Sequence, residues 1–253
     1  MKRLPQEFAD LLSPKGVRVL GGSAASCGAL VRGPSRVAAV TGLIDPRWAA
    51  AIPSMFERAL GDVLTRMEEK IPEWTVTGMH ENYSEVLPKS VRVRTALMDS
   101  RRAKAFARAQ DLGLIALMRS DSFHAFAQAL SGFALKKTWG RQLLQYREGD
   151  YAGPHNDHHP EEAEAAFGYT DLHITFCNEG VRRQSLVVER DGHLNQTYDI
   201  ATRGGVTCYR LPVWHYTTPL EVRRGLGLKA RRWVLLGTFV DASKTPRSQA
   251  PAR

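Results

Sequence analysis

Two histidines and one aspartate in the second half of the chain are spaced so that they could hold one metal ion. His155 and Asp157 are separated by a single residue, and in an extended segment residues two apart point to the same side. An imidazole and a carboxylate would then face one ion, and a third ligand would complete a facial triad with open positions for reactants. His215 is the candidate third ligand, because it lies in the strand-like run Val-Trp-His-Tyr-Thr, 58 positions after Asp157.

A His-x-Asp pair alone does not identify a metal site, because any loop rich in histidine and aspartate contains one. The chain has eight histidines, and His158 and His159 directly follow the pair. We interpret these two as solvent-facing loop residues. The glutamate-containing segment 160–169 is predicted to be an exposed loop near the mouth of the site.

An arginine near the C-terminus is the second feature that could take part in binding or catalysis. Arg232 stands at the start of the apolar run 233–240. A guanidinium buried at the start of a strand needs an anionic partner, and a planar carboxylate is its best geometric match. Alternation along the strand favours Arg232 over Arg231 as the inward residue, with Val234, Leu236 and Thr238 on the same face and Trp233, Leu235 and Phe239 facing a helical layer.

The composition is that of a soluble globular protein with a basic surface. The chain has 253 residues, 43% of them hydrophobic, and this length and hydrophobic content are enough for one buried core. Its net charge is +9. It contains no run of 18 apolar residues, so we expect no membrane span. Its three cysteines form no CxxC pair, which favours a reducing, cytoplasmic setting. The charge alone would suit nucleic acid, but no aromatic-flanked basic stripe accompanies it, so this partner is disfavoured without being excluded.

The first 140 residues are predicted to form supporting helices and strands. Apolar residues recur at helical spacing from Met55 to Met67, with Pro53 in the first turn of the helix. Two further helices are expected, over 100–110 and from about Ser120 onwards. The predicted strands of this half cover 29–31, 37–44 and 91–98.

The texture changes after Gly140, where short strand-like runs alternate with turn residues. Strands are predicted over 142–146, 172–177, 185–189, 206–211, 213–217 and 232–240. Many short strands at nearly regular spacing favour a jelly roll or barrel. We therefore expect a mostly β protein with flanking helices, in which 1–140 supports a core at 141–242. The whole chain, 1–253, is predicted to be one domain with a disordered tail at 243–253.

With these features in order, the stretch from Gly140 to Ala242 resembles the Fe(II)/2-oxoglutarate-dependent dioxygenase superfamily, in particular its prolyl-hydroxylase-like branch. The strand that carries Tyr146 leads into His155-Asn-Asp157, His215 follows as the distal histidine, and Arg232 opens the last core strand. The resemblance implies a double-stranded β-helix that binds Fe(II) through His155, Asp157 and His215. The segment 219–230 is longer here than is common in the family.

The resemblance also implies an oxidoreductase activity. The cosubstrate 2-oxoglutarate would bind the metal, pair its far carboxylate with Arg232 and accept a hydrogen bond from Tyr146, and O2 would take the remaining metal position. Because Asp157 is present, hydroxylation or a related oxidation is implied rather than halogenation. The substrate would be peptidyl or a small molecule, with succinate and CO2 released.

Three other functions stay open at this point. A cupin-like metal enzyme without 2-oxoglutarate would have no use for Arg232. A nucleic-acid demethylase of the same superfamily generally has a second arginine six residues later, where this chain has Thr238. A catalytically silent binding protein would not need the complete triad. Independently, acidic residues in 160–169 and basic residues near His215 predict a cavity mouth with both charges; the basic set is Arg210, Arg223, Arg224 and Lys229.

Overall fold

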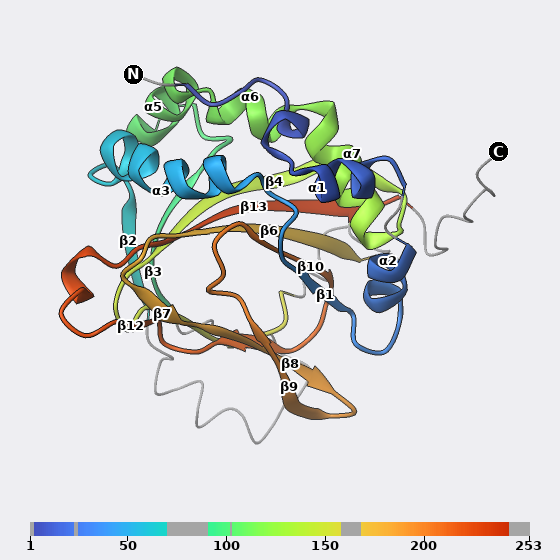
Figure 1. Cartoon of the computed structure of the whole chain (residues 1–253). Helices are drawn as coiled ribbons and strands as arrows, with labels where there is room; N and C mark the ends of the chain where they lie inside the picture. The colour runs from blue at the N-terminus through green and yellow to red at the C-terminus, as the bar shows by residue number, and fades with distance from the viewer. Residues whose placement is uncertain (1–2, 23–24, 70–90, 102, 158–167, 243–253) are drawn as a thin grey trace.

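The computed structural model describes residues 3–22, 25–69, 91–101, 103–157 and 168–242. His158, His159, most of the predicted loop at 160–169 and the predicted tail at 243–253 lie outside the described residues. The body of the protein is an 11-stranded sheet that curls toward itself like a barrel, with helices along one side (Figure 1). This arrangement confirms the prediction of a mostly β protein with flanking helices.

The large sheet is antiparallel throughout and runs β1-β10-β6-β13-β4-β3-β5-β11-β8-β9, with β2 paired to β3. Its strands are β1 (Val37–Val40), β2 (Thr65–Glu69), β3 (Val91–Leu97), β4 (Leu135–Tyr146), β5 (Tyr151–His155), β6 (Tyr169–Cys177), β8 (Ser185–Arg190), β9 (His193–Asp199), β10 (Gly205–Leu211), β11 (His215–Thr217) and β13 (Arg232–Asp241). A separate pair is formed by β7 (Val181–Arg183) and β12 (Glu221–Val222).

Helices cover the outer face of the sheet above β4, β13 and β6, on the side away from the β8–β9 hairpin (Figure 1). They are α1 (Pro14–Leu20), α2 (Ala25–Arg32), α3 (Pro46–Leu60), α5 (Lys104–Leu112), α6 (Leu114–Arg119) and α7 (Asp121–Ser131), with short 3-10 turns η1 (Phe8–Leu11) and η3 (Gly227–Lys229). Among the described residues, no helix has the length and apolar character needed to cross a bilayer.

The main core lies between these helices and the sheet. Trp233 of β13 packs against Phe56 of α3 with ring centroids 5.5 Å apart, and Phe239 packs against Phe123 of α7 at 5.8 Å. Both aromatic residues of β13 are fully buried in this cluster, together with Leu235. The predicted alternation along β13 is therefore confirmed, and the other face of the strand points into the barrel.

Two of the predicted elements differ from the structure. Residues 29–31 belong to helix α2 rather than to a strand. The helix expected from about Pro53 through Met67 ends at Leu60, with Gly61 as its C-cap, and Met67 lies in strand β2 instead. It begins at Pro46, where Asp45 caps it by accepting a hydrogen bond from the Arg47 backbone N–H at 2.8 Å. Asp45 followed by proline is a strong helix-start signal, and it outweighs the cost of Pro53 in the helix interior.

Candidate metal centre

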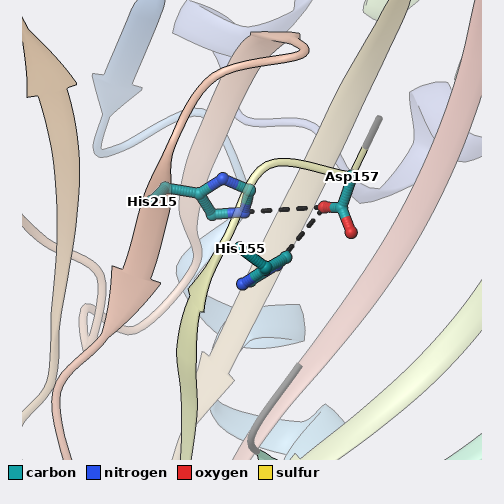
Figure 2. A group of neighbouring side chains, drawn as sticks. All are labelled: His155, Asp157 and His215. Carbon is teal, nitrogen blue, oxygen red and sulfur yellow. Dashed lines mark ion pairs between the residues drawn. The ribbon is translucent and has the colours of Figure 1, made fainter. Parts of the chain in front are cut away.

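The three residues predicted to share a metal ion lie together on one side of the barrel interior. His155 ends β5 and His215 begins β11, and the two are direct cross-strand partners with ring centroids 4.1 Å apart. Asp157 reaches both: its Oδ2 lies 3.3 Å from His155 Nε2 and 3.6 Å from His215 Nε2 (Figure 2). One candidate ligand atom from each residue lies within 4.8 Å of the others, which is a separation that one first-row metal ion can bridge.

Backbone carbonyls fix the orientation of both imidazoles. His155 Nδ1 lies 2.7 Å from the Gly153 carbonyl, and His215 Nδ1 lies 2.8 Å from the Val213 carbonyl. A carbonyl oxygen only accepts, so each Nδ1 is the protonated nitrogen. In the neutral rings this leaves the lone pairs on the two Nε2 atoms, which are the atoms that face Asp157. Histidine ligands are commonly held in this way, with one ring nitrogen on a carbonyl and the other on the metal.

The reason why Asp157 faces the histidines is not the one expected from the sequence. Strand β5 ends at His155, and Asp157 has a left-handed backbone with φ of 51°. The carboxylate is therefore turned toward the histidines by a bend after the strand and not by strand alternation. Aspartate tolerates this conformation better than most residues, and its side chain remains about one-third exposed.

Arg232 is buried to 1% exposure on the inner face of β13. Its guanidinium donates to the Ile200 carbonyl at 3.1 Å, to Gln184 Oε1 at 3.0 Å and to Thr175 Oγ1 at 3.2 Å. All three partners are neutral, and among the described residues no carboxylate forms an ion pair with Arg232. Burial lowers the pKa of this guanidinium from its usual value, but an arginine still remains charged. A buried cation held only by neutral groups is suited to an anionic ligand.

Tyr146 lies beside Arg232 and lines the same cavity. The two residues are register partners across β4 and β13, and the guanidinium carbon lies 5.0 Å from the centre of the tyrosine ring. Burial raises the pKa of the Tyr146 phenol, with Arg232 opposing the shift, so the hydroxyl is a proton donor at neutral pH. Arg231 points the other way and pairs with Glu57 of α3 at 3.2 Å. The prediction that Arg232 and not Arg231 faces inward is confirmed.

One cavity of about 110 Å³ joins these groups. The cavity is small and partly enclosed, and it is lined by the three candidate ligands, Tyr146 and Arg232. The remaining lining is mostly apolar and includes Val91, Val93, Leu144, Leu186, Ile200 and Leu236. An apolar lining with a few convergent polar groups is typical of ligand sites.

Six further polar residues of the cavity were not singled out from the sequence: Gln142, Asp171, His173, Thr207, Tyr209 and Thr217. Asp171 and His173 lie on the inner face of β6 and Tyr209 on that of β10. A signal was available, because Asp171 directly precedes the strand predicted over 172–177 and has with His173 the i, i+2 spacing that makes two side chains of a strand share a face. Burial, followed by the charges of Asp171 and Asp157, raises the pKa of Tyr209 well above its ordinary value.

The predicted basic side of the cavity mouth is wrong. Arg210 turns outward, where it pairs with Asp241 at 3.0 Å and stacks 4.2 Å from the centre of the Phe133 ring. The other three residues of the basic set, Arg223, Arg224 and Lys229, line a separate depression near η3. The acidic half of the expectation lies in 160–167, outside the described residues.

No family model and no curated protein sequence matches the chain. Solved structures do match. A prolyl-4-hydroxylase from Pseudomonas putida aligns over 87% of this chain and 99% of its own, with a TM-score of 0.53 and 16% identity. A 2OG-Fe(II) oxygenase family oxidoreductase from Burkholderia pseudomallei aligns over 88% and 94%, with a TM-score of 0.54 and 14% identity. The non-haem α-ketoglutarate-dependent epimerase SnoN of nogalamycin biosynthesis aligns over 90% and 84%, with a TM-score of 0.51 and 13% identity.

At identities this low, the similarity shows a shared fold and not a shared reaction, since the three proteins are a hydroxylase, an oxidoreductase and an epimerase. The predicted architecture is thereby confirmed: the chain has the double-stranded β-helix fold of the Fe(II)- and 2-oxoglutarate-dependent oxygenases.

Proposed function

We propose that the protein is an Fe(II)- and 2-oxoglutarate-dependent dioxygenase that hydroxylates, or otherwise oxidises, a C–H group of a peptidyl or small-molecule substrate. One observation carries the proposal. Two carbonyl-anchored histidines and Asp157 face one point in a cavity that also contains a buried arginine without a carboxylate partner among the described residues. The fold shared with oxygenases of this type supports it.

One group of side chains fits the metal, and another fits the cosubstrate. Two neutral imidazoles and one carboxylate are the facial triad of non-haem Fe(II) oxygenases, which leaves positions open for reactants. His155, Asp157 and His215 would hold the ion. Arg232 would hold the far carboxylate of 2-oxoglutarate through a charge-assisted, bidentate contact.

The chain's own residues would position and shield the reactants. Gln184, Thr175 and the Ile200 carbonyl hold the guanidinium of Arg232 in place before any ligand arrives, so little side-chain entropy would be lost on binding. The Tyr146 hydroxyl would donate a hydrogen bond to the cosubstrate. The apolar lining would exclude water from the reacting groups.

When bound, Fe(II) and 2-oxoglutarate supply the oxidising chemistry, in which one O2, one 2-oxoglutarate and a substrate C–H give succinate, CO2 and a C–OH group. A cupin-like enzyme that does not use 2-oxoglutarate is less well supported, because it would leave the buried charge of Arg232 unused. A nucleic-acid demethylase is disfavoured by Thr238 at the position of the expected second arginine.

The proposal is tested by metal content and cosubstrate turnover of the purified protein. We expect one Fe(II) per chain and succinate formation that requires Fe(II), O2 and 2-oxoglutarate together. Asparagine at position 157 still tolerates the left-handed backbone. Asp157→Asn should therefore fold but bind the metal more than about 100-fold more weakly than the wild type, which is a larger loss than that caused by removing a residue that only hydrogen-bonds to a ligand. Asp191→Asn, the same change at an exposed turn with φ of 55°, is the matched control.

Metal binding by Asp157→Asn equal to that of the wild type would contradict the assignment of this ligand. Tight Fe(II) binding without any 2-oxoglutarate-dependent succinate would instead favour the cupin-like alternative.

A further inference from the structure

Asp171 is a buried carboxylate of the cavity with an oxygen atom that has no partner among the described residues. It is 4% exposed, and its Oδ1 atom is shielded from solvent without a hydrogen-bond donor. The other oxygen, Oδ2, lies 3.5 Å from His173 Nε2. An unsatisfied oxygen on a buried carboxylate is costly, and such a group in a ligand cavity suits a donor that arrives with the ligand.

Two neighbouring side chains connect Asp171 with the candidate metal centre. His173 Nε2 lies 3.0 Å from the Tyr209 hydroxyl, and the Tyr209 ring packs against that of His215 with centroids 5.2 Å apart. The carboxylate therefore belongs to the same chamber as the triad, on the side of His215.

Asp171 and Arg232 lie at opposite ends of one strand pair. Across β6 and β13, Arg232 is the register partner of Cys177, whereas Asp171 is that of Thr238. Six residues along β13 separate these two positions, which corresponds to about 20 Å of extended strand. A group bound at Arg232 would thus leave the environment of Asp171 free for a second molecule.

The charges of the loaded site point the same way. Fe(II) and Arg232 together carry three positive charges, and Asp157 and 2-oxoglutarate together carry three negative ones. Asp171 is then the remaining carboxylate among the described residues that line the cavity. Uncompensated charge in a site of low dielectric favours a ligand of opposite sign and penalises one of the same sign.

We infer that Asp171, supported by His173 and Tyr209, forms the subsite for a protonated amine of the prime substrate. This inference rests on the proposed function and specifies its substrate class: a C–H group near the metal in a molecule that carries an ammonium group. The ammonium would donate to Asp171 Oδ1, the atom without a partner, while Oδ2 keeps its contact with His173.

The ligand used to test this subsite is n-butylammonium, with 1-butanol as its uncharged counterpart of similar size. Binding of each is measured by ligand-detected NMR to protein loaded with Zn(II) and 2-oxoglutarate, so that no turnover occurs. The wild type is expected to bind n-butylammonium at least about tenfold more tightly than 1-butanol, as one charge-assisted contact implies. Asp171→Asn should lose this preference, and Asp191→Asn should keep it.

Binding of 2-oxoglutarate is measured on the same samples, which separates the two hypotheses. The inference predicts a 2-oxoglutarate Kd unchanged within about twofold in Asp171→Asn. Equal wild-type affinity for the two four-carbon ligands, in protein that binds 2-oxoglutarate, would overturn the amine subsite alone. This comparison uses the wild type and holds even if Asp171→Asn does not fold. Failure of the wild type to bind 2-oxoglutarate would refute the proposed function itself.

Discussion

At the scale of single residues, hydrogen bonds made by the groups around the cavity determine what it can bind. The Gly153 and Val213 carbonyls set the tautomers of His155 and His215, so the nitrogen lone pairs are directed to one point before a metal arrives. Such preorganisation reduces the conformational cost of binding. The sequence predicts the three residues, but not these two carbonyl contacts, because they depend on the ring orientation after each strand has formed.

Replacement of Arg232 tests the cosubstrate site. Arg232→Ala should weaken 2-oxoglutarate binding by about 2–5 kcal/mol, because a buried carboxylate would lose its charged partner. Arg232→Lys should lie between this variant and the wild type, since an ammonium keeps the charge but not the fork of donors. Calorimetric titration of the Zn(II)-loaded protein measures both changes.

Arg231→Ala is the matched control for this experiment, because Arg231 is the preceding residue and contacts Glu57 outside the barrel. It should leave 2-oxoglutarate binding unchanged. Loss of binding in Arg231→Ala together with normal binding in Arg232→Ala would reverse the assignment of the two arginines.

At the scale of elements, strands with strong apolar alternation were predictable and the helical layer was less so. The strand predicted over 232–240 is β13, Arg232–Asp241, and the one over 172–177 is the C-terminal part of β6, Tyr169–Cys177. In contrast, the exposed strand β9, His193–Asp199, was missed, since its largely exposed residues have no apolar face to reveal it. Helix α2 was misread because Ala29–Val31 is short and apolar, a pattern that fits a buried helix as well as a strand.

The junction between β13 and α7 gives an element-scale prediction. A Cβ atom added to Gly237 would lie 2.7 Å from Phe123 Cε1 and 2.9 Å from Phe239 Cε2. Gly237→Ala should therefore lower the free energy of unfolding by about 1–3 kcal/mol, the usual range for overpacking. Chemical denaturation measures the change.

Gly140→Ala provides the comparison, because Gly140 lies on the neighbouring strand β4 and an added Cβ atom would meet nothing within 4 Å. Its effect should be neutral or a stabilisation of about 0.4–1 kcal/mol from the less flexible unfolded chain. Equal destabilisation by both substitutions would contradict this account, because it would show that the loss does not come from the contact of Gly237 with Phe123 of α7.

At the scale of the whole molecule, the cysteines report on the integrity of the fold. All three, Cys27, Cys177 and Cys208, are free and buried. Burial raises the pKa of the Cys177 thiol to about 12, so this thiol stays protonated at pH 8, where the reactive thiolate would be needed. We expect the native protein to react with a thiol reagent only as fast as it unfolds, and denaturant to release all three thiols. Rapid labelling of Cys177 in the native state would contradict the barrel packing.

The same pKa shift has a consequence for alkaline stability. Between the ordinary thiol pKa of 9.0 and the folded value of about 12, the unfolded chain releases a proton that the folded protein keeps. The unfolded state then binds fewer protons, so this contribution to stability falls as the pH rises through that range. In Cys177→Ala the decline of the unfolding free energy above pH 9 should be shallower, which denaturation at several pH values would measure.

The claim that His155, Asp157, His215 and Arg232 form one site for Fe(II) and 2-oxoglutarate is tested most directly by a visible absorption spectrum recorded without oxygen. Adding 2-oxoglutarate to the Fe(II)-loaded protein should produce a weak metal-to-ligand charge-transfer band that saturates at one equivalent per iron. The band should be absent from Asp157→Asn and need much more 2-oxoglutarate in Arg232→Ala. A folded, Fe(II)-loaded wild-type protein that shows no such band at saturating 2-oxoglutarate would contradict the account.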